Sequence, residues 1–138
     1  MVTFSALLNS KNLDLLPKVE KGQFKLLWHC DYWDGAKSGM LLYKDKKHWF
    51  QVFNENDDKD YYRRFAIVEL SESQLAEEES WHELFREKVG THTDYGESGK
   101  RAVGTLKPQE LWSEFYNAYK NRSPQDFSNN QVVAWFEI

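Results

Sequence analysis

Apolar and polar positions alternate along four short stretches in the first half of the chain, which cover residues 23–33, 40–44, 48–54 and 63–70. In the first stretch, Phe24, Leu26 and Trp28 occupy every second position. A period of two is typical of a strand with one buried face, because successive side chains point to opposite faces of a sheet. The links between the stretches are short and polar, which favours an antiparallel meander.

The period changes to that of a helix after the fourth stretch. Ser71 and Gln74 have the S-x-x-Q spacing of a capping box, and Gly90 is placed to end the helix that follows. Pro108 suits the first turn of a second helix. At the start of the chain, residues 3–16 predict a short helix or two half-helices.

These elements predict an α+β fold. We expect a mostly antiparallel sheet of about five strands, a four-strand meander joined by a C-terminal strand at residues 131–138, with two or three helices packed on one face. The pattern leaves open whether the C-terminal strand lies at an edge of the sheet or between earlier strands. With 138 residues, the chain is expected to form a single globular domain over residues 1–138.

The predicted core combines the apolar face of each strand with the apolar face of each long helix. It consists of Phe24, Leu26, Trp28, Phe50, Val52, Phe65, Ile67, Trp81, Leu84, Phe85, Trp112, Phe115, Val133 and Trp135. A shift of one residue along a strand exchanges its two faces, so these assignments depend on the phase of each alternation.

Composition excludes several classes of protein. Aromatic residues make up 16% of the chain and hydrophobic residues 41%, which excludes a disordered chain. The formal net charge of −4 argues against a nucleic-acid partner, because binding to phosphates is favoured by a basic excess. No apolar run approaches the roughly 20 residues that span a bilayer, so no membrane partner is expected. The single cysteine, Cys30, cannot form an internal disulfide, and the first residues lack the charged start of a signal peptide, so we expect a cytoplasmic protein.

Aromatic and charged residues gather at the first and third predicted loops. In an up-and-down meander, these two connections emerge at the same end of the sheet, so we expect them to lie side by side. Aromatic side chains and arginine often dominate the binding energy of protein interfaces. We therefore predict a partner-binding surface formed by Trp33, Asp34, Lys37, Tyr61, Tyr62, Arg63 and Arg64.

A second candidate site is a set of imidazole and carboxylate groups on the helix that follows the capping box and just beyond it. Glu78 and His82 are four positions apart, so they share a side of this helix with Phe85. Ionisable groups are unusual on an apolar side, and imidazole with carboxylates can hold a metal ion. The candidate metal ligands are Glu78, Glu79, His82, His92 and Asp94. The alternative is a structural His–carboxylate pair, with the run of glutamates favoured by the positive end of the helix dipole.

The sequence carries no specific catalytic motif, and no cofactor is expected. We predict a small interaction domain that binds another protein through its aromatic and charged surface, as inhibitors and immunity proteins do. The alternative is a metal-dependent or acid–base enzyme that uses the His/Glu/Asp cluster. A third alternative is a nucleic-acid mimic, based on the acidic stripe Glu72, Glu77, Glu78, Glu79 and Glu83.

Overall fold

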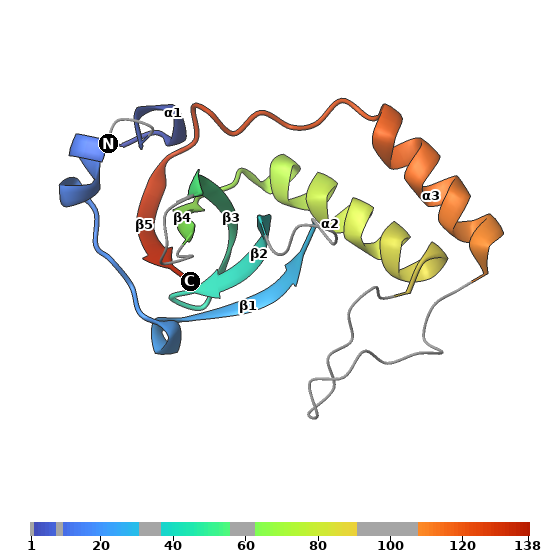
Figure 1. Ribbon diagram of the computed structural model, residues 1–138, viewed down its shortest axis with the longest axis horizontal. Coiled ribbons are helices and arrows are strands. Elements are labelled where there is room, and N and C mark those ends of the chain that lie inside the picture. Colours follow the sequence, from blue (N-terminus) through green and yellow to red (C-terminus); the bar gives the residue numbers. More distant parts are fainter. Residues whose placement is uncertain (1, 8–9, 31–36, 56–62, 91–107) are drawn as a thin grey trace. The chain divides into compact units, whose positions relative to one another are not determined.

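Five strands lie in the sheet in the same order as in the chain, β1-β2-β3-β4-β5, in a computed structural model of the protein (Figure 1). The structure describes residues 2–7, 10–30, 37–55, 63–90 and 108–138. The strands are β1 Phe24–His29, β2 Ser38–Tyr43, β3 Lys46–Glu55, β4 Arg63–Val68 and β5 Val132–Glu137. Every neighbouring pair is antiparallel, which confirms the predicted meander and places the C-terminal strand at the edge beside β4.

The helical segments confirm the α+β class. They are α1 Phe4–Leu7, η1 Ser10–Leu15, η2 Lys21–Gln23, α2 Glu72–Lys88 and α3 Gln109–Asn121, where η denotes a 3-10 helix. The chain divides into two compact units, a sheet unit made of Met1–Leu70 with Asp126–Ile138 and a helical unit made of Ser71–Gln125. The expectation of a single domain over the whole chain stays a prediction.

The centre of the sheet unit is a set of phenylalanine rings enclosed by the curled sheet. The ring centroids of Phe24 on β1 and Phe136 on β5 are 4.3 Å apart, although β1 and β5 are the two edge strands. Phe65 stacks on Phe136 at 5.0 Å, and Phe50 meets Phe65 edge-on at 5.9 Å. A flat sheet would hold the two edge strands about 19 Å apart, at roughly 4.8 Å per strand. The sheet therefore curls strongly around these rings (Figure 1).

The chain before β1 covers the outer edge of β5. The Val19 N–H donates to the Trp135 carbonyl at 2.9 Å, and the Trp135 N–H donates to the Pro17 carbonyl at 3.1 Å. Lys18 and Trp135 form the parallel bridge between the two segments. Since an uncovered edge strand can pair with other chains, this contact protects one side of the sheet.

Burial agrees with the predicted core in the central strands and differs from it at the sheet edges. The fully buried members of the predicted core are Phe50, Phe65, Ile67, Phe85 and Phe115. The prediction is wrong for Leu26, which is 43% exposed because β1 is an edge strand of the described sheet. In β5 the fully buried residues are Val132, Ala134 and Phe136, whereas the predicted Val133 and Trp135 are partly buried. Residues 132–136 are all apolar, so alternation gives no phase for this strand.

The helical unit begins where the capping box predicts. The Gln74 N–H donates to Ser71 Oγ at 3.2 Å, and the Ser71 N–H donates to Gln74 Oε1 at 3.0 Å. Gly90, with a φ of 90°, follows the end of α2 in the left-handed conformation that glycine adopts readily. Phe85 and Phe115 pack α2 against α3, with ring centroids 5.5 Å apart. Neither of these helices, nor any other in the described part of the chain, has the length and apolar character needed to cross a membrane.

We expect Phe136→Ala to lower the free energy of unfolding by about 3–5 kcal/mol, as for other buried phenylalanines. Phe136 is 1% exposed, and its ring contacts both Phe24 and Phe65. Urea denaturation followed by tryptophan fluorescence measures the loss. Ile138→Ala, at a residue that is 43% exposed just after the same strand, is the matched control and should cost less than about 1 kcal/mol. Equal losses for the two variants would contradict a core centred on these rings.

Candidate protein-binding site

Predicted binding residues from both loops lie at the same end of the sheet. The Lys37 carbonyl, just before β2, accepts a hydrogen bond from the Val52 N–H of β3 at 2.8 Å. Arg63, at the start of β4, exchanges backbone hydrogen bonds of 2.8 and 3.0 Å with Ile138. The meander therefore brings Lys37 and Arg63 to the same end of β2 and β4, the two strands that flank β3. The other loop residues predicted for this surface, Trp33, Asp34, Tyr61 and Tyr62, lie outside the described residues and stay predictions.

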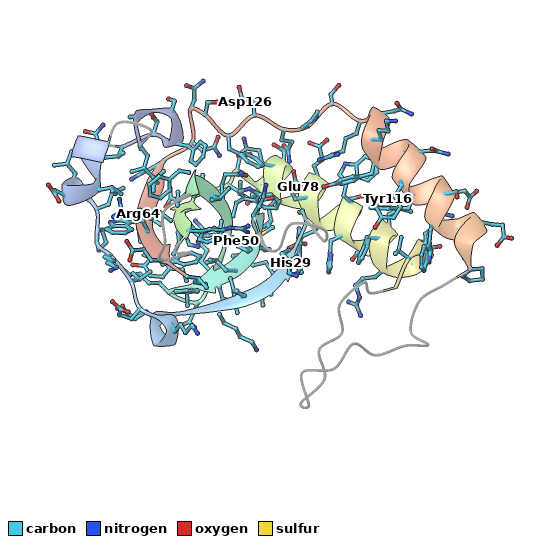
Figure 2. All side chains as sticks on the ribbon, viewed as in Figure 1. His29, Phe50, Arg64, Glu78, Tyr116 and Asp126 are labelled. Carbon is cyan, nitrogen blue, oxygen red and sulfur yellow. The ribbon has the colours of Figure 1, made fainter. Side chains whose placement is uncertain are left out.

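Arg64 belongs to a patch on the face of β4 and β5 opposite the phenylalanine rings (Figure 2). We name the residues Lys18, Arg64, Trp135 and Glu137 the Trp135 patch. Arg64 Nε lies 2.9 Å from Glu137 Oε1, and Lys18 Nζ lies 3.3 Å from Glu137 Oε2. Lys18 Nζ and Arg64 Cζ also lie over the Trp135 ring, 5.4 and 5.6 Å from its centroid. One carboxylate thus holds two cations beside one indole.

Strand register builds this patch. Arg64 pairs directly with Glu137, and Ala66 pairs with Trp135, so these side chains share one face of the sheet. Lys18 joins them through its parallel bridge to Trp135. The side chains of Lys18 and Arg64 are 45% and 38% exposed, so the patch is accessible to solvent.

Glu137 is the electrostatic centre of the patch. Burial opposes its negative charge, but hydrogen bonds from Arg64 and Lys18 outweigh this effect and lower the pKa of Glu137 below its ordinary value. The carboxylate is therefore ionised at neutral pH. Because both cations are substantially exposed, the two ion pairs add little to stability. Their main effect is to hold Lys18 and Arg64 in place around the Trp135 ring.

Sequence reasoning misses three of the four patch residues. Trp135 and Glu137 carry a signal, because they are two positions apart in a predicted strand and so share a face. Lys18 carries none, since it lies 119 positions from Glu137 along the chain. Its place in the patch depends on the pairing of residues 17–19 with β5, which no local pattern predicts.

Glu78, the first of the predicted metal ligands, is buried in the helical unit with 7% exposure (Figure 2). Its Oε1 accepts a hydrogen bond from Gln125 Nε2 at 3.2 Å, and Gln125 Nε2 also donates to the Gln74 carbonyl at 3.0 Å. Burial raises the pKa of Glu78, and the Gln125 hydrogen bond and the Arg122 charge offset this only in part. These contacts tie the segment after α3 to α2, which is a structural role.

His82 is partly buried on the same helix. Burial, assisted by the Arg86 charge and opposed by the Glu79 charge, lowers the pKa of His82 to about 4. The imidazole is therefore neutral at physiological pH. Among the residues that the structure describes, no three His, Cys, Asp or Glu side chains gather as metal ligands. His92 and Asp94 lie outside those residues, so the metal site stays a prediction.

We expect Glu78→Gln to stabilise the protein near neutral pH. The folded state binds the Glu78 proton more tightly than the unfolded state does, so the stability of the wild type falls as pH rises from 4.5 through the raised pKa. Glutamine keeps an acceptor for Gln125 and has no charge to desolvate. The melting temperature of the variant should therefore exceed that of the wild type near neutral pH, with a smaller difference near pH 4.

Glu83→Gln removes the same charge at an exposed position of the same helix and is the matched control for this experiment. It should not reproduce the pH-dependent difference between variant and wild type. A melting temperature for Glu78→Gln below that of the wild type at neutral pH would show that burial of the charge is not the dominant effect at this position.

No protein-family model, no curated protein and no solved structure matches this chain. We therefore infer a function from the contacts of the chain's own residues.

Proposed function

We propose that this chain is a cytoplasmic protein-binding domain whose partner contacts the Trp135 patch and the neighbouring loop-bearing end of the sheet. The observation that carries the proposal is that two exposed cations, Lys18 and Arg64, lie over the Trp135 ring. The single cysteine of the chain suits a reducing compartment. The proposal includes the class of small inhibitors and immunity proteins, which act by covering a surface of their target.

The chemistry of the patch is that of an interface anchor. Tryptophan and arginine are enriched among the few residues that dominate binding energy in protein interfaces. Ordering of flexible side chains opposes binding, by about 0.5–1.5 kcal/mol for each side chain immobilised. Glu137 already holds Arg64 and Lys18 in the free protein, so less ordering remains for the complex.

Charge indicates what the partner presents to this surface. Lys18 and Arg64 lie in the patch, against the single carboxylate of Glu137 within it. An excess of positive charge favours a partner with carboxylates at the rim of its binding surface and speeds association with it. We therefore propose an acidic surface on the partner, with an apolar contact for the Trp135 ring.

Photo-crosslinking in cells of the source organism tests this proposal. A benzophenone amino acid is placed at Lys18, which is 45% exposed within the patch. The matched control is Lys44, an exposed residue in the turn between β2 and β3, at the opposite end of the sheet. We expect a defined protein to be captured from Lys18 and not from Lys44. Identical products from both positions, or no product from Lys18, would contradict the proposal.

Once that protein is purified, we expect Trp135→Ala to weaken its binding by at least about 2 kcal/mol, roughly 30-fold in Kd. The strand pairing at Trp135 uses backbone groups, so the sheet is retained, and circular dichroism checks this. Leu15→Ala, at a residue that is 69% exposed outside the patch, is the control. Unchanged affinity of a folded Trp135→Ala variant in calorimetry would remove the patch from the binding site.

A further inference from the structure

The indole N–H of Trp135 is a buried hydrogen-bond donor that lacks an acceptor. Trp135 Nε1 is buried and makes no hydrogen bond to any residue that the structure describes. Buried tryptophan N–H groups usually have a partner, because a donor that loses water and gains no acceptor destabilises the fold. A phenylalanine at this position would present an aromatic ring without that cost. The unpaired N–H at the centre of the Trp135 patch therefore needs an explanation.

Trp49 on β3 shows how the same sheet satisfies such a group. Trp49 Nε1 donates to Gln51 Oε1 at 3.2 Å, two positions further along the strand and so on the same face. The residue two positions after Trp135 is Glu137, but its two carboxylate oxygens are held by the two cations of the patch. These cations thus occupy the acceptor that the same spacing would otherwise provide.

The neighbouring strands supply no other side-chain acceptor in this row of the sheet. Trp135 is opposite Ala66 on β4, and Ala66 is opposite Gln51 on β3. Alanine has no polar side-chain atom, and Gln51 Oε1 already accepts from Trp49. Within the described sheet, strand register therefore leaves the N–H of Trp135 without a partner.

Positive charge surrounds this donor. Lys18 Nζ and Arg64 Cζ lie 5.4 and 5.6 Å from the centroid of the Trp135 ring. An acceptor that reached the N–H of the same ring would therefore lie near both cations. A carboxylate suits this position best, because a hydrogen bond to an ionised acceptor is stronger than one to a neutral amide or carbonyl, and the cations attract its charge.

We propose that a carboxylate side chain of the partner accepts a hydrogen bond from Trp135 Nε1 and pairs with Lys18 and Arg64. This inference rests on the protein-binding function proposed above and adds that one acidic residue of the partner enters the centre of the patch. The side chains of Lys18 and Arg64 are 45% and 38% exposed, so they can move apart to admit it. A partner without an acceptor would leave the buried donor unpaired, so the N–H selects for acidic partners.

The first test asks whether the N–H is unpaired in the free protein. Benzothienylalanine, a tryptophan analogue in which sulfur replaces the N–H, is placed at Trp135 and, as the matched control, at Trp49 in a second protein. With the analogue at Trp135, we expect an unchanged or higher melting temperature, because an unpaired buried donor is removed. The analogue at Trp49 should lower the melting temperature, because Gln51 loses its donor. Equal losses at both positions would overturn the proposal.

The second test uses N-acetylglutamate amide as a probe for the partner's carboxylate, with N-acetylglutamine amide as its uncharged counterpart. The indole N–H signals of the whole chain are followed by nuclear magnetic resonance, and Trp135→Phe identifies the signal of Trp135. We expect the glutamate probe to shift this signal downfield and saturably, and the glutamine probe to shift it far less. Arg64→Gln should weaken binding of the probe at least about threefold. Lys44→Gln, at an exposed lysine at the opposite end of the sheet, is the control and should not weaken it.

Failure of this inference is distinguishable from failure of the proposed function. Absence of a saturable shift at the Trp135 N–H, equal shifts from the two probes, or equal weakening by Arg64→Gln and Lys44→Gln would overturn the carboxylate contact, even if a protein is crosslinked at Lys18. Absence of any crosslinked protein at Lys18 would instead contradict the proposed function, because the melting temperatures and the probe shifts do not depend on that protein.

Discussion

The contact between Phe24 and Phe136 determines the shape of the sheet unit. These rings belong to the first and last strands of the sheet, and they can approach to 4.3 Å only if the sheet curls. Burial of each aromatic side chain contributes about 1.5–3 kcal/mol, and favourable ring geometry adds about 0.5–1.5 kcal/mol for each pair. Phe65 extends the contact by stacking on Phe136, so that rings from three strands form one cluster. The curled shape is therefore fixed by the interior of the sheet.

The same cluster fixes which residues of β5 face outwards. Because Phe136 is held in the interior, its neighbours Trp135 and Glu137 must point to the opposite face. Arg64 is opposite Glu137 in the neighbouring strand, so an ion pair on the outer face follows from packing on the inner one. Residues 17–19 then pair with Trp135 before the chain enters β1. One connection thus completes the Trp135 patch and covers the outer edge of β5.

The type and order of the elements could be predicted from the sequence because the signals are local. Alternation indicates the strands, and Ser71 with Gln74 marks the start of α2. The β2–β3 turn gives no such signal, since Lys44 and Asp45 adopt φ values of 52° and 61° that are more typical of asparagine and glycine. Gly39 belongs to β2 although its sequence context suggests a loop. A Cβ at this position would lie 2.1 Å from the Trp28 carbonyl oxygen, so only glycine allows β1 to approach so closely.

The candidate sites were less predictable because they depend on contacts between distant segments. The meander does bring Lys37 and Arg63 to one end, which topology alone predicts. Lys18 enters the Trp135 patch from the other end of the chain, and only the pairing of residues 17–19 with β5 accounts for it. Exposure of Leu26 follows from the place of β1 at the edge of the sheet. An alternating pattern predicts which residues share one face of a strand, but the position of the strand in the sheet decides how far that face is covered.

In the helical unit, burial favours the neutral forms of two ionisable groups. It raises the pKa of Glu78 and lowers that of His82, so both side chains are driven towards their neutral forms. A metal ligand needs a neutral imidazole and an ionised carboxylate. The environment of His82 meets the first condition. The environment of Glu78 opposes the second, because burial disfavours the ionised carboxylate, and Glu78 Oε1 already accepts a hydrogen bond from Gln125. The inner side of α2 is thus better suited to packing with hydrogen-bonded polar groups than to coordination.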